Sequence, residues 1–254
     1  MNKENYKKYL SIIIPAFNEA KNLEILIPEI VSVLKNKNIN NWEIILTNDG
    51  SSDNTINTVN KLGNLIKAIN FPEHLGKAQM LMAGFKKAEG EIIITLDADL
   101  QDDPAEIQRF IKKINEGYDL VSGRKFHRLD SLIKNNTSKI YNLATSLISG
   151  VWLHDHNCGF KAYKAPVVEN LRLFGQLHRY IPVLAAANGF EKITEININH
   201  RKRVFGKTKY NWTRFFWGII GLIHVIIITN GKAVYFIRKI KKLFQQYGNY
   251  FKII

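Results

Sequence analysis

The sequence contains a single cysteine, Cys158, and this scarcity excludes two common ways of stabilising a fold. One cysteine cannot form a disulfide framework within the chain, and it cannot supply a cysteine-rich zinc site. The N-terminal residues enter a short strand-like run without the longer apolar stretch of a signal peptide. We therefore expect a reducing compartment that faces the cytosol, and nothing in the sequence favours export.

Two glycine-rich nucleotide motifs are also missing. The first strand-like segment is not followed by G-x-G-x-x-G, and G-x-x-x-x-G-K-[ST] does not occur. Because these motifs cradle phosphates with backbone N–H groups, their absence argues against dinucleotide oxidoreductases and P-loop NTPases. A hydrophobic fraction of 46% in 254 residues still allows a sizeable core and excludes general disorder.

Acidic residues are absent from the last fifth of the chain. Residues 201–254 carry 12 Lys and Arg and no Asp or Glu, which gives +12 of the net charge of +14. The remainder is nearly balanced, with 11 bases against 12 acids in residues 1–100 and 13 against 10 in residues 101–200. Such a tail suits an anionic lipid, an anionic substrate or nucleic acid.

Apolar patterning predicts an α/β domain with a mostly parallel sheet and a more helical second half. Strands are expected at Leu10–Pro15, Trp42–Thr47, Leu65–Phe71, Ile92–Leu96, Asp119–Gly123 and, at an edge, Ile193–Asn199. Helices are expected over 23–34 with a kink or division at Pro28, after Asp53, over Lys77–Ala88, from Pro104, over Leu132–Ile148 and over Phe174–Ala187. No domain boundary is evident before about residue 212.

The stretch EIIITLDADLQDDP places carboxylates directly after a buried strand. Ligands bind beyond the carboxyl ends of parallel strands, so Asp97 and Asp99 are expected where chemistry takes place. With the amide oxygen of Gln101 they provide the hard oxygen ligands that Mg²⁺ or Mn²⁺ prefers, and a nucleotide diphosphate would complete the coordination. The alternative is a solvated acidic turn in which Asp102 and Asp103 cap the following helix.

Two other strand ends predict a nucleotide pocket at the same edge. In PAFNE, Pro15 and Phe17 could line a flat base pocket and Glu19 could accept from a ribose hydroxyl. In TNDGSSDNT, Asp49 could accept from a base N–H. Lys77, in HLGKAQ, opens a helix whose N-terminus could face phosphate. A lone lysine is, however, more often a solvated surface residue.

With PAFNE, NDGSSDNT and DADLQ in this order, the chain resembles family-2 glycosyltransferases, and more closely the dolichol-phosphate mannosyltransferase group and its bacterial polyprenyl-phosphate relatives. The resemblance covers about residues 9–215 and continues in SGRK, HNCGFKAY, HRYIP and HRKRVFGKTKY. It implies a Rossmann-like glycosyltransferase A-type fold over residues 1–211. Residues 212–254 are expected, from their apolar and basic pattern, to form a membrane-associating helical tail. It also implies an inverting transfer of a sugar from a nucleoside diphosphate to undecaprenyl or dolichyl phosphate.

The resemblance implies roles for individual residues as well. A UDP- or GDP-linked sugar would be held by Pro15, Phe17, Glu19, Asn48, Asp49, Lys77, Asp97 and Ala98. The acceptor phosphate would be bound by Lys134, Ser138, Arg203 and Lys209. The catalytic set would be Asp97, Asp99, Arg124 and Asp155, with the metal on Asp97, Asp99 and Gln101. Lys134 stands where relatives carry Arg, which keeps the charge but loses bidentate binding of phosphate.

The expected chemistry brings two anions together. A phosphate monoester has its second pKa at about 6, so a lipid phosphate is already an anionic nucleophile at neutral pH and needs no general base. The metal ion and the basic residues at 124, 134, 203 and 209 would offset the repulsion. Two alternatives remain open. Transfer to a sugar hydroxyl would require a base, for which Asp155 is the obvious candidate. A non-catalytic membrane- or nucleic-acid-binding module would use only the basic tail.

The uncharged run Phe215–Thr229 predicts an interfacial or buried helix, since it would extend about 22 Å, less than the roughly 30 Å of a bilayer core. The segment IRKIKKLF resembles a basic amphipathic helix for an anionic leaflet. We therefore expect a peripheral or monotopic protein at the cytoplasmic face of a membrane. Nucleic acid is not an expected partner. The sequence leaves open whether the chain forms a homo-oligomer.

Overall fold

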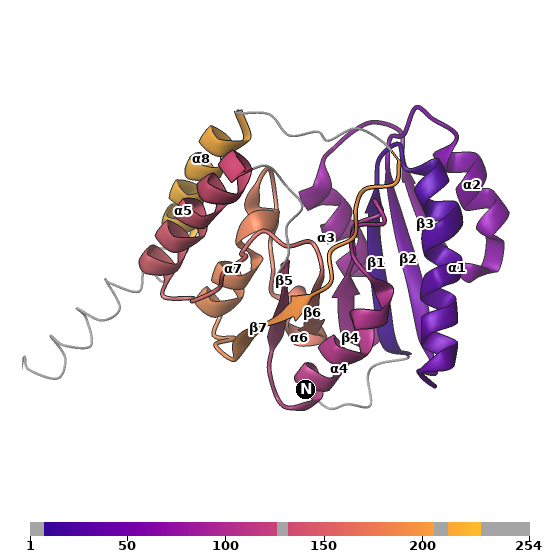
Figure 1. Ribbon diagram of the computed structural model, residues 1–254, viewed down its shortest axis with the longest axis horizontal. Coiled ribbons are helices and arrows are strands. Elements are labelled where there is room, and N and C mark those ends of the chain that lie inside the picture. The colour runs from indigo at the N-terminus through magenta and orange to yellow at the C-terminus, as the bar shows by residue number, and fades with distance from the viewer. Residues whose placement is uncertain (1–7, 126–131, 206–212, 230–254) are drawn as a thin grey trace, which may run out of the picture.

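The computed structural model describes residues 8–125, 132–205 and 213–229, which form a sheet with helices on both faces (Figure 1). The sheet has seven strands in the order β3-β2-β1-β4-β6-β5-β7. In chain order these strands are β1 Lys8–Ala16, β2 Trp42–Asp49, β3 Lys67–Phe71, β4 Gly90–Thr95, β5 Leu120–Lys125, β6 Lys161–Lys164 and β7 Ile193–Ile198.

All strands except β6 run in the same direction. β1 is parallel to β2 and β4, β2 is parallel to β3, and β5 is parallel to β7. β6 is antiparallel to both β4 and β5, so these two strands point the same way as each other. The carboxyl ends of β1, β2, β4, β5 and β7 therefore meet at one edge of the sheet, together with the amino end of β6. This edge is where the predicted site residues should gather.

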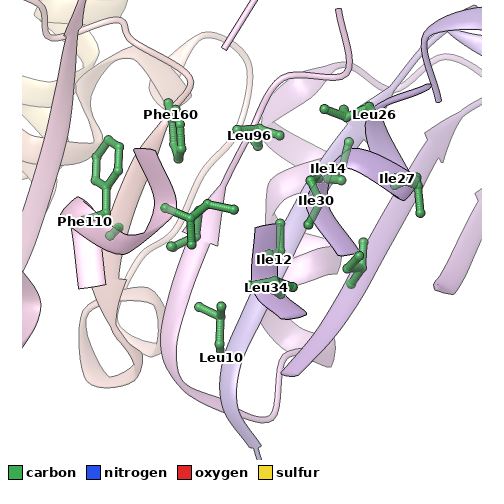
Figure 2. Close-up of a cluster of buried hydrophobic side chains, with 14 of the residues drawn as sticks. Leu10, Ile12, Ile14, Leu26, Ile27, Ile30, Leu34, Leu96, Phe110 and Phe160 are labelled. Carbon is green, nitrogen blue, oxygen red and sulfur yellow. The ribbon is translucent and has the colours of Figure 1, made fainter. Parts of the chain in front are cut away.

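The helices pack on the sheet or on one another. They are α1 Ala20–Asn36, α2 Thr55–Leu62, α3 Lys77–Lys87, α4 Ile107–Asn115, α5 Leu132–Ser149, α6 Ala165–Glu169, α7 Ile181–Ala187 and α8 Thr213–Ile228, with short 3₁₀ turns at Gly63–Leu65, Pro104–Glu106 and Leu177–Tyr180. On one face, α1 covers the even-numbered residues of β1 (Figure 2), which include Leu10, Ile12 and Ile14, and α4 lies over β4, β5 and β6. On the other face, α3, α6 and α7 cover Ile13 and its neighbours. This alternation follows from the period of two along a strand.

The fold class predicted from the sequence is confirmed, and the predicted strands all form. Three details were wrong. Pro28 does not divide α1, which continues as one helix because the exposed position of Pro28 leaves the unpaired carbonyl of the preceding turn able to reach water. β3 begins at Lys67 rather than Leu65, because Gly63–Leu65 forms a 3₁₀ turn. The helix expected from Phe174 begins only with the 3₁₀ turn at Leu177, because Gly175 has a φ of 51°, which is outside the right-handed helical range.

The antiparallel strand β6 was missed. Lys161–Lys164 is only four residues long and follows a polar loop, so neither its length nor its pattern distinguishes it from that loop. Its insertion between β4 and β5 matters for the site, because it brings the HNCGFKAY segment next to the end of β4. Thr95 Oγ1 donates a hydrogen bond of 2.7 Å to the carbonyl oxygen of Gly159.

α8 packs on the domain through its small and apolar residues. Val225 is fully buried in the cluster that α3 and α7 form, and a Cβ at Gly221 would lie 2.7 Å from the ring of Tyr180. In the part of the chain that the structure describes, no helix has the length and apolar character needed to cross a membrane. The boundary at residue 212 and the segment Tyr235–Phe244 lie outside the described residues, so the division into two domains stays a prediction.

Candidate active site

The loops that follow β1 and β2 are bonded to each other at the expected edge. Asn18 has a φ of 58°, and its Oδ1 accepts from the backbone N–H of Ser52 at 2.8 Å and of Asp53 at 3.3 Å. The carboxylate of Asp53 accepts in turn from the N–H of Ala20 and of Thr55. These reciprocal bonds hold PAFNE beside NDGSSDNT, as one nucleotide pocket would require.

Phe17 and Asp49 meet at His74, for which the sequence alone predicted no role. The ring of Phe17 lies 4.2 Å from the His74 ring, and His74 Nδ1 is 2.8 Å from Asp49 Oδ2. Asp49 is buried and also accepts from the N–H of Leu75 at 2.7 Å and of Gly76 at 3.0 Å. Its first role is therefore to fix the loop that begins α3. The available signal for His74 was its place in HLGKAQ, just before Lys77.

Asn48 and Glu19 are both engaged inside the protein. Asn48 is fully buried, donates to Asn70 Oδ1 at 3.1 Å and accepts from the hydroxyl of Ser51. Glu19 accepts from the side-chain amide of the buried Asn22. Asn48 thus shapes the loop by internal bonds, and the carboxylate of Glu19 is oriented by its neighbour on α1.

Lys77 is not a solvated surface lysine. Its ammonium forms an ion pair with the carboxylate of Asp97, and each side chain is only about one third exposed. Burial alone would raise the pKa of Asp97, but Lys77, Lys125 and Lys161 outweigh it and lower the pKa to about 2. Asp97 is therefore a carboxylate throughout the neutral range, in a strongly positive local field.

Gly159 leaves the space that the Asp97 carboxylate occupies. A Cβ at position 159 would lie 2.4 Å from Asp97 Oδ2, closer than atoms can approach. Behind it, the buried Lys161 donates to the carbonyl oxygen of Cys158, and burial lowers the pKa of Lys161. Gly159 and Lys161 belong to HNCGFKAY, and the sequence assigned neither of them a role.

The turn after β4 presents Asp99 and Gln101 to one cation. Leu100, at the centre of the turn, has a φ of 61° although it is a bulky buried residue, a conformation that costs of order 1–3 kcal/mol. Arg203 Nη2 lies 2.6 Å from Asp99 Oδ2 and 3.1 Å from Gln101 Oε1. A residue predicted to bind the acceptor thus meets two residues predicted to bind the metal.

A buried ion pair supports this turn from below. Asp102 is fully buried, and Lys125 Nζ lies 3.5 Å from its Oδ1. Burial raises the pKa of Asp102, and Lys125 only partly offsets this effect. Asp103 caps the next turn by accepting from the N–H of Ala105. The two acids were considered as alternative caps, and only Asp103 has that role.

The ligand set fits a hard divalent cation, because it consists of carboxylate and amide oxygens. Asp99 and Gln101 already converge on a positive charge, whereas Asp97 is paired with Lys77. Within the described ranges, no three His, Cys, Asp or Glu side chains form a metal site by themselves. Oxygens from water or from a bound ligand would therefore have to complete the coordination.

Arg124 lies near the end of β5, and Asp155 lies in the loop between α5 and β6. Arg124 Nη1 is 3.9 Å from Glu195 Oε1, and Glu195 also binds the ring of His154. Asp155 is buried, and its Oδ1 accepts from the N–H of Asn157 at 3.2 Å. This bond orients the carboxylate within its own loop, and the role of Asp155 as a base stays a prediction.

The remaining predicted residues are placed only in part. Pro15 is partly exposed at the end of β1, and Ala98 is buried between the two acids of DADLQ. Lys134 and Ser138 lie on α5, where the structure describes the backbone but not these side chains. Lys209 lies outside the described residues, so the predicted acceptor set stays a prediction except for the position of Arg203.

The chain matches a protein-family model and several curated proteins. The model named Glycosyl transferase family 2 matches residues 11–172. The undecaprenyl-phosphate 4-deoxy-4-formamido-L-arabinose transferase of Photorhabdus laumondii is 36% identical over 219 residues, which cover 84% of this chain and 66% of that protein. The transferase of the same name from Yersinia enterocolitica is 37% identical over 83% of this chain and 65% of its own length. The chain thus spans slightly less than two thirds of these relatives.

Solved structures share the fold. Glucosyl-3-phosphoglycerate synthase from Mycobacterium tuberculosis, in complex with phosphoglyceric acid, superposes with a TM-score of 0.69 at 19% identity over 86% of this chain and 80% of that chain. The same enzyme in complex with Mn²⁺, uridine diphosphate and glucosyl-3-phosphoglycerate gives 0.67 at 17% identity, over 87% and 80%. These similarities confirm the glycosyltransferase A-type fold.

Proposed function

This chain belongs to glycosyltransferase family 2, and we propose that it transfers a sugar from a nucleoside diphosphate onto a polyprenyl phosphate at a membrane surface. The proposal is supported by its relatives, which are named undecaprenyl-phosphate transferases. It is also supported by the motifs that gather at one edge of the sheet.

One observation carries the proposal: Arg203 contacts Asp99 and Gln101. The reaction requires positive charge for an acceptor phosphate and oxygen ligands for the cation of a donor diphosphate at the same place. Residues 99 and 203 are far apart in sequence, yet their side chains meet at 2.6 Å. One residue of the predicted acceptor set therefore lies beside two of the predicted metal ligands.

The residues of the chain account for the steps of the transfer. The donor would lie along PAFNE and NDGSSDNT, with its diphosphate near Asp97, Asp99 and Lys77. A phosphate oxygen of the lipid attacks the anomeric carbon, a new C–O bond forms, and the bond from that carbon to the diphosphate breaks with inversion. A bound Mg²⁺ or Mn²⁺ would supply charge neutralisation to the departing nucleoside diphosphate. Arg203 would offset the charge of the attacking phosphate.

The surface formed by α5 and α8 suits a membrane. Tyr180 contacts both helices, since its ring lies 6.0 Å from that of Tyr141 on α5 and against Gly221 on α8. Large apolar side chains are exposed on and beside these helices: Leu143, Leu147, Trp152, Ile220, Ile223 and Ile227. The residues that follow α8 in the sequence belong to the segment 201–254, whose charge of +12 would attract an anionic leaflet. We therefore place the protein peripherally at the cytoplasmic face.

A donor panel tests the proposal. The purified chain is incubated with Mn²⁺, undecaprenyl phosphate and one radiolabelled nucleotide sugar at a time, from both the UDP and GDP series. We expect labelled lipid from at least one donor, and its loss in Asp99→Asn but not in the control Glu116→Gln, whose carboxylate pairs with Lys113 at the surface. Label transferred equally well by Asp99→Asn would contradict the assignment of the site.

A further inference from the structure

Arg203 occupies the oxygens that a metal ion would need. Its Nη2 atom is shared between Asp99 Oδ2 at 2.6 Å and Gln101 Oε1 at 3.1 Å. A guanidinium is protonated under all physiological conditions, so in this contact the acidic turn holds a full positive charge from the protein. Asp99 and Gln101 thus bind the Arg203 guanidinium of the protein itself.

The segment that carries Arg203 is anchored before that residue and exposed after it. The N–H of Arg201 donates to the carbonyl oxygen of Gln101 at 2.8 Å, and its guanidinium binds Glu29 and Asp103, both at 2.7 Å. Lys202 and Val204, on either side of Arg203, are exposed. The Arg203 side chain can therefore leave Asp99 and Gln101 while the backbone stays bound to the DADLQ turn.

From this geometry we infer that Arg203 and a divalent cation bind Asp99 and Gln101 in turn. A metal held by Asp99 Oδ2 and Gln101 Oε1 would use the same oxygens that now accept from Nη2, and two cations on one carboxylate oxygen repel each other. Metal binding thus releases Arg203, and the released guanidinium becomes available to an anion. This inference deepens the proposed function, on which it rests for the metal ligands.

The exchange couples two binding events. If the metal frees Arg203 for an anion, an anion that holds Arg203 away must raise the affinity for the metal by the same factor. Donor cation and acceptor phosphate would then bind cooperatively although they need not touch. Arg203 acts in this scheme as a positioning residue whose charge moves from the donor side of the site to the acceptor side.

The test measures Mn²⁺ affinity by electron paramagnetic resonance, with neither sugar donor nor lipid present. The exchange predicts that Arg203→Ala binds Mn²⁺ about tenfold more tightly than the wild type and that Arg203→Lys lies in between. Lys202→Ala removes the same charge one residue away, outside the contact, and should match the wild type. Equal or weaker Mn²⁺ binding by Arg203→Ala would overturn the inference, as would an equal gain in Lys202→Ala.

Sulfate provides an independent probe of the coupling. At matched ionic strength, replacing chloride by sulfate should tighten Mn²⁺ binding by the wild type relative to Arg203→Ala, because the anion holds the guanidinium away from Asp99. No difference between the two proteins would contradict the coupling. Neither measurement involves sugar transfer. A chain that shows the exchange but transfers no sugar would refute the proposed function alone. A chain that transfers sugar but shows no exchange would refute the exchange alone.

Discussion

Gly159→Ala should disable the site without unfolding the protein. The added Cβ would lie 2.4 Å from Asp97 Oδ2, whereas ordinary van der Waals contact begins at 3.4 Å, so the carboxylate must move by about 1 Å. A shift of that size at a reacting centre lowers the rate by about 100-fold, or about 2.7 kcal/mol of transition-state stabilisation. Because the displaced atoms are the end of a flexible side chain, the free energy of unfolding should change by less than about 1 kcal/mol.

The assay for Gly159→Ala combines kcat/KM for sugar transfer to undecaprenyl phosphate with urea unfolding of the same preparation. A large loss of activity with nearly unchanged stability supports the close packing of Gly159 on Asp97. Wild-type activity would refute it, since the carboxylate would then not need its observed position. If the free energy of unfolding instead fell by about as much as the transition-state stabilisation, Gly159 would be needed for the fold rather than for the site.

Three further predictions concern the charges and the apolar surface. The charged form of Asp97 stabilises the folded chain above its unfolded pKa of about 3.9, and this contribution is lost as the pH falls to about 2. Lys77→Met should therefore raise the pKa of Asp97, measured by NMR titration. Lys125→Met should cost about 3 kcal/mol or more in urea unfolding, because it leaves Asp102 buried without its partner. Ile223→Asp, on the exposed face of α8, should weaken sedimentation with anionic liposomes severalfold.

Each of these predictions has a contrary result. An unchanged Asp97 titration in Lys77→Met would show that the ion pair does not set its pKa. For the buried pair, adding Asp102→Asn to Lys125→Met should recover part of the lost stability, and failure to do so would argue against the pairing. Ile25→Asp, on the exposed side of α1, is the control for the membrane surface, and equal losses in both variants would remove the role of α8.

The fold was predictable because its patterns are local. The apolar strands and the helices between them show their period directly, and Asp97 and Asp99 follow a strand that can only be buried. The short strand β6 could not be found in this way. Its place depends on pairing with β4 and β5, which are remote in sequence.

The candidate site was predictable as a set of residues but not as a set of partners. The sequence indicated Lys77 and Asp97 separately, and only the structure pairs them. Gly159 could not be given a role, because its function is to leave space for a side chain 62 positions earlier. Likewise, the contact of Arg203 with Asp99 depends on how β7 leads its following segment back over the end of β4.

The choice of acceptor tests the central claim most directly. The chain, Mn²⁺ and an active nucleotide sugar are combined with either undecaprenyl phosphate or undecaprenol in identical micelles, and the initial rates of labelled lipid formation are compared. A site built to bring two anions together predicts transfer to the phosphate, with transfer to the alcohol lower by at least two orders of magnitude. Equal rates with the two lipids would contradict the account.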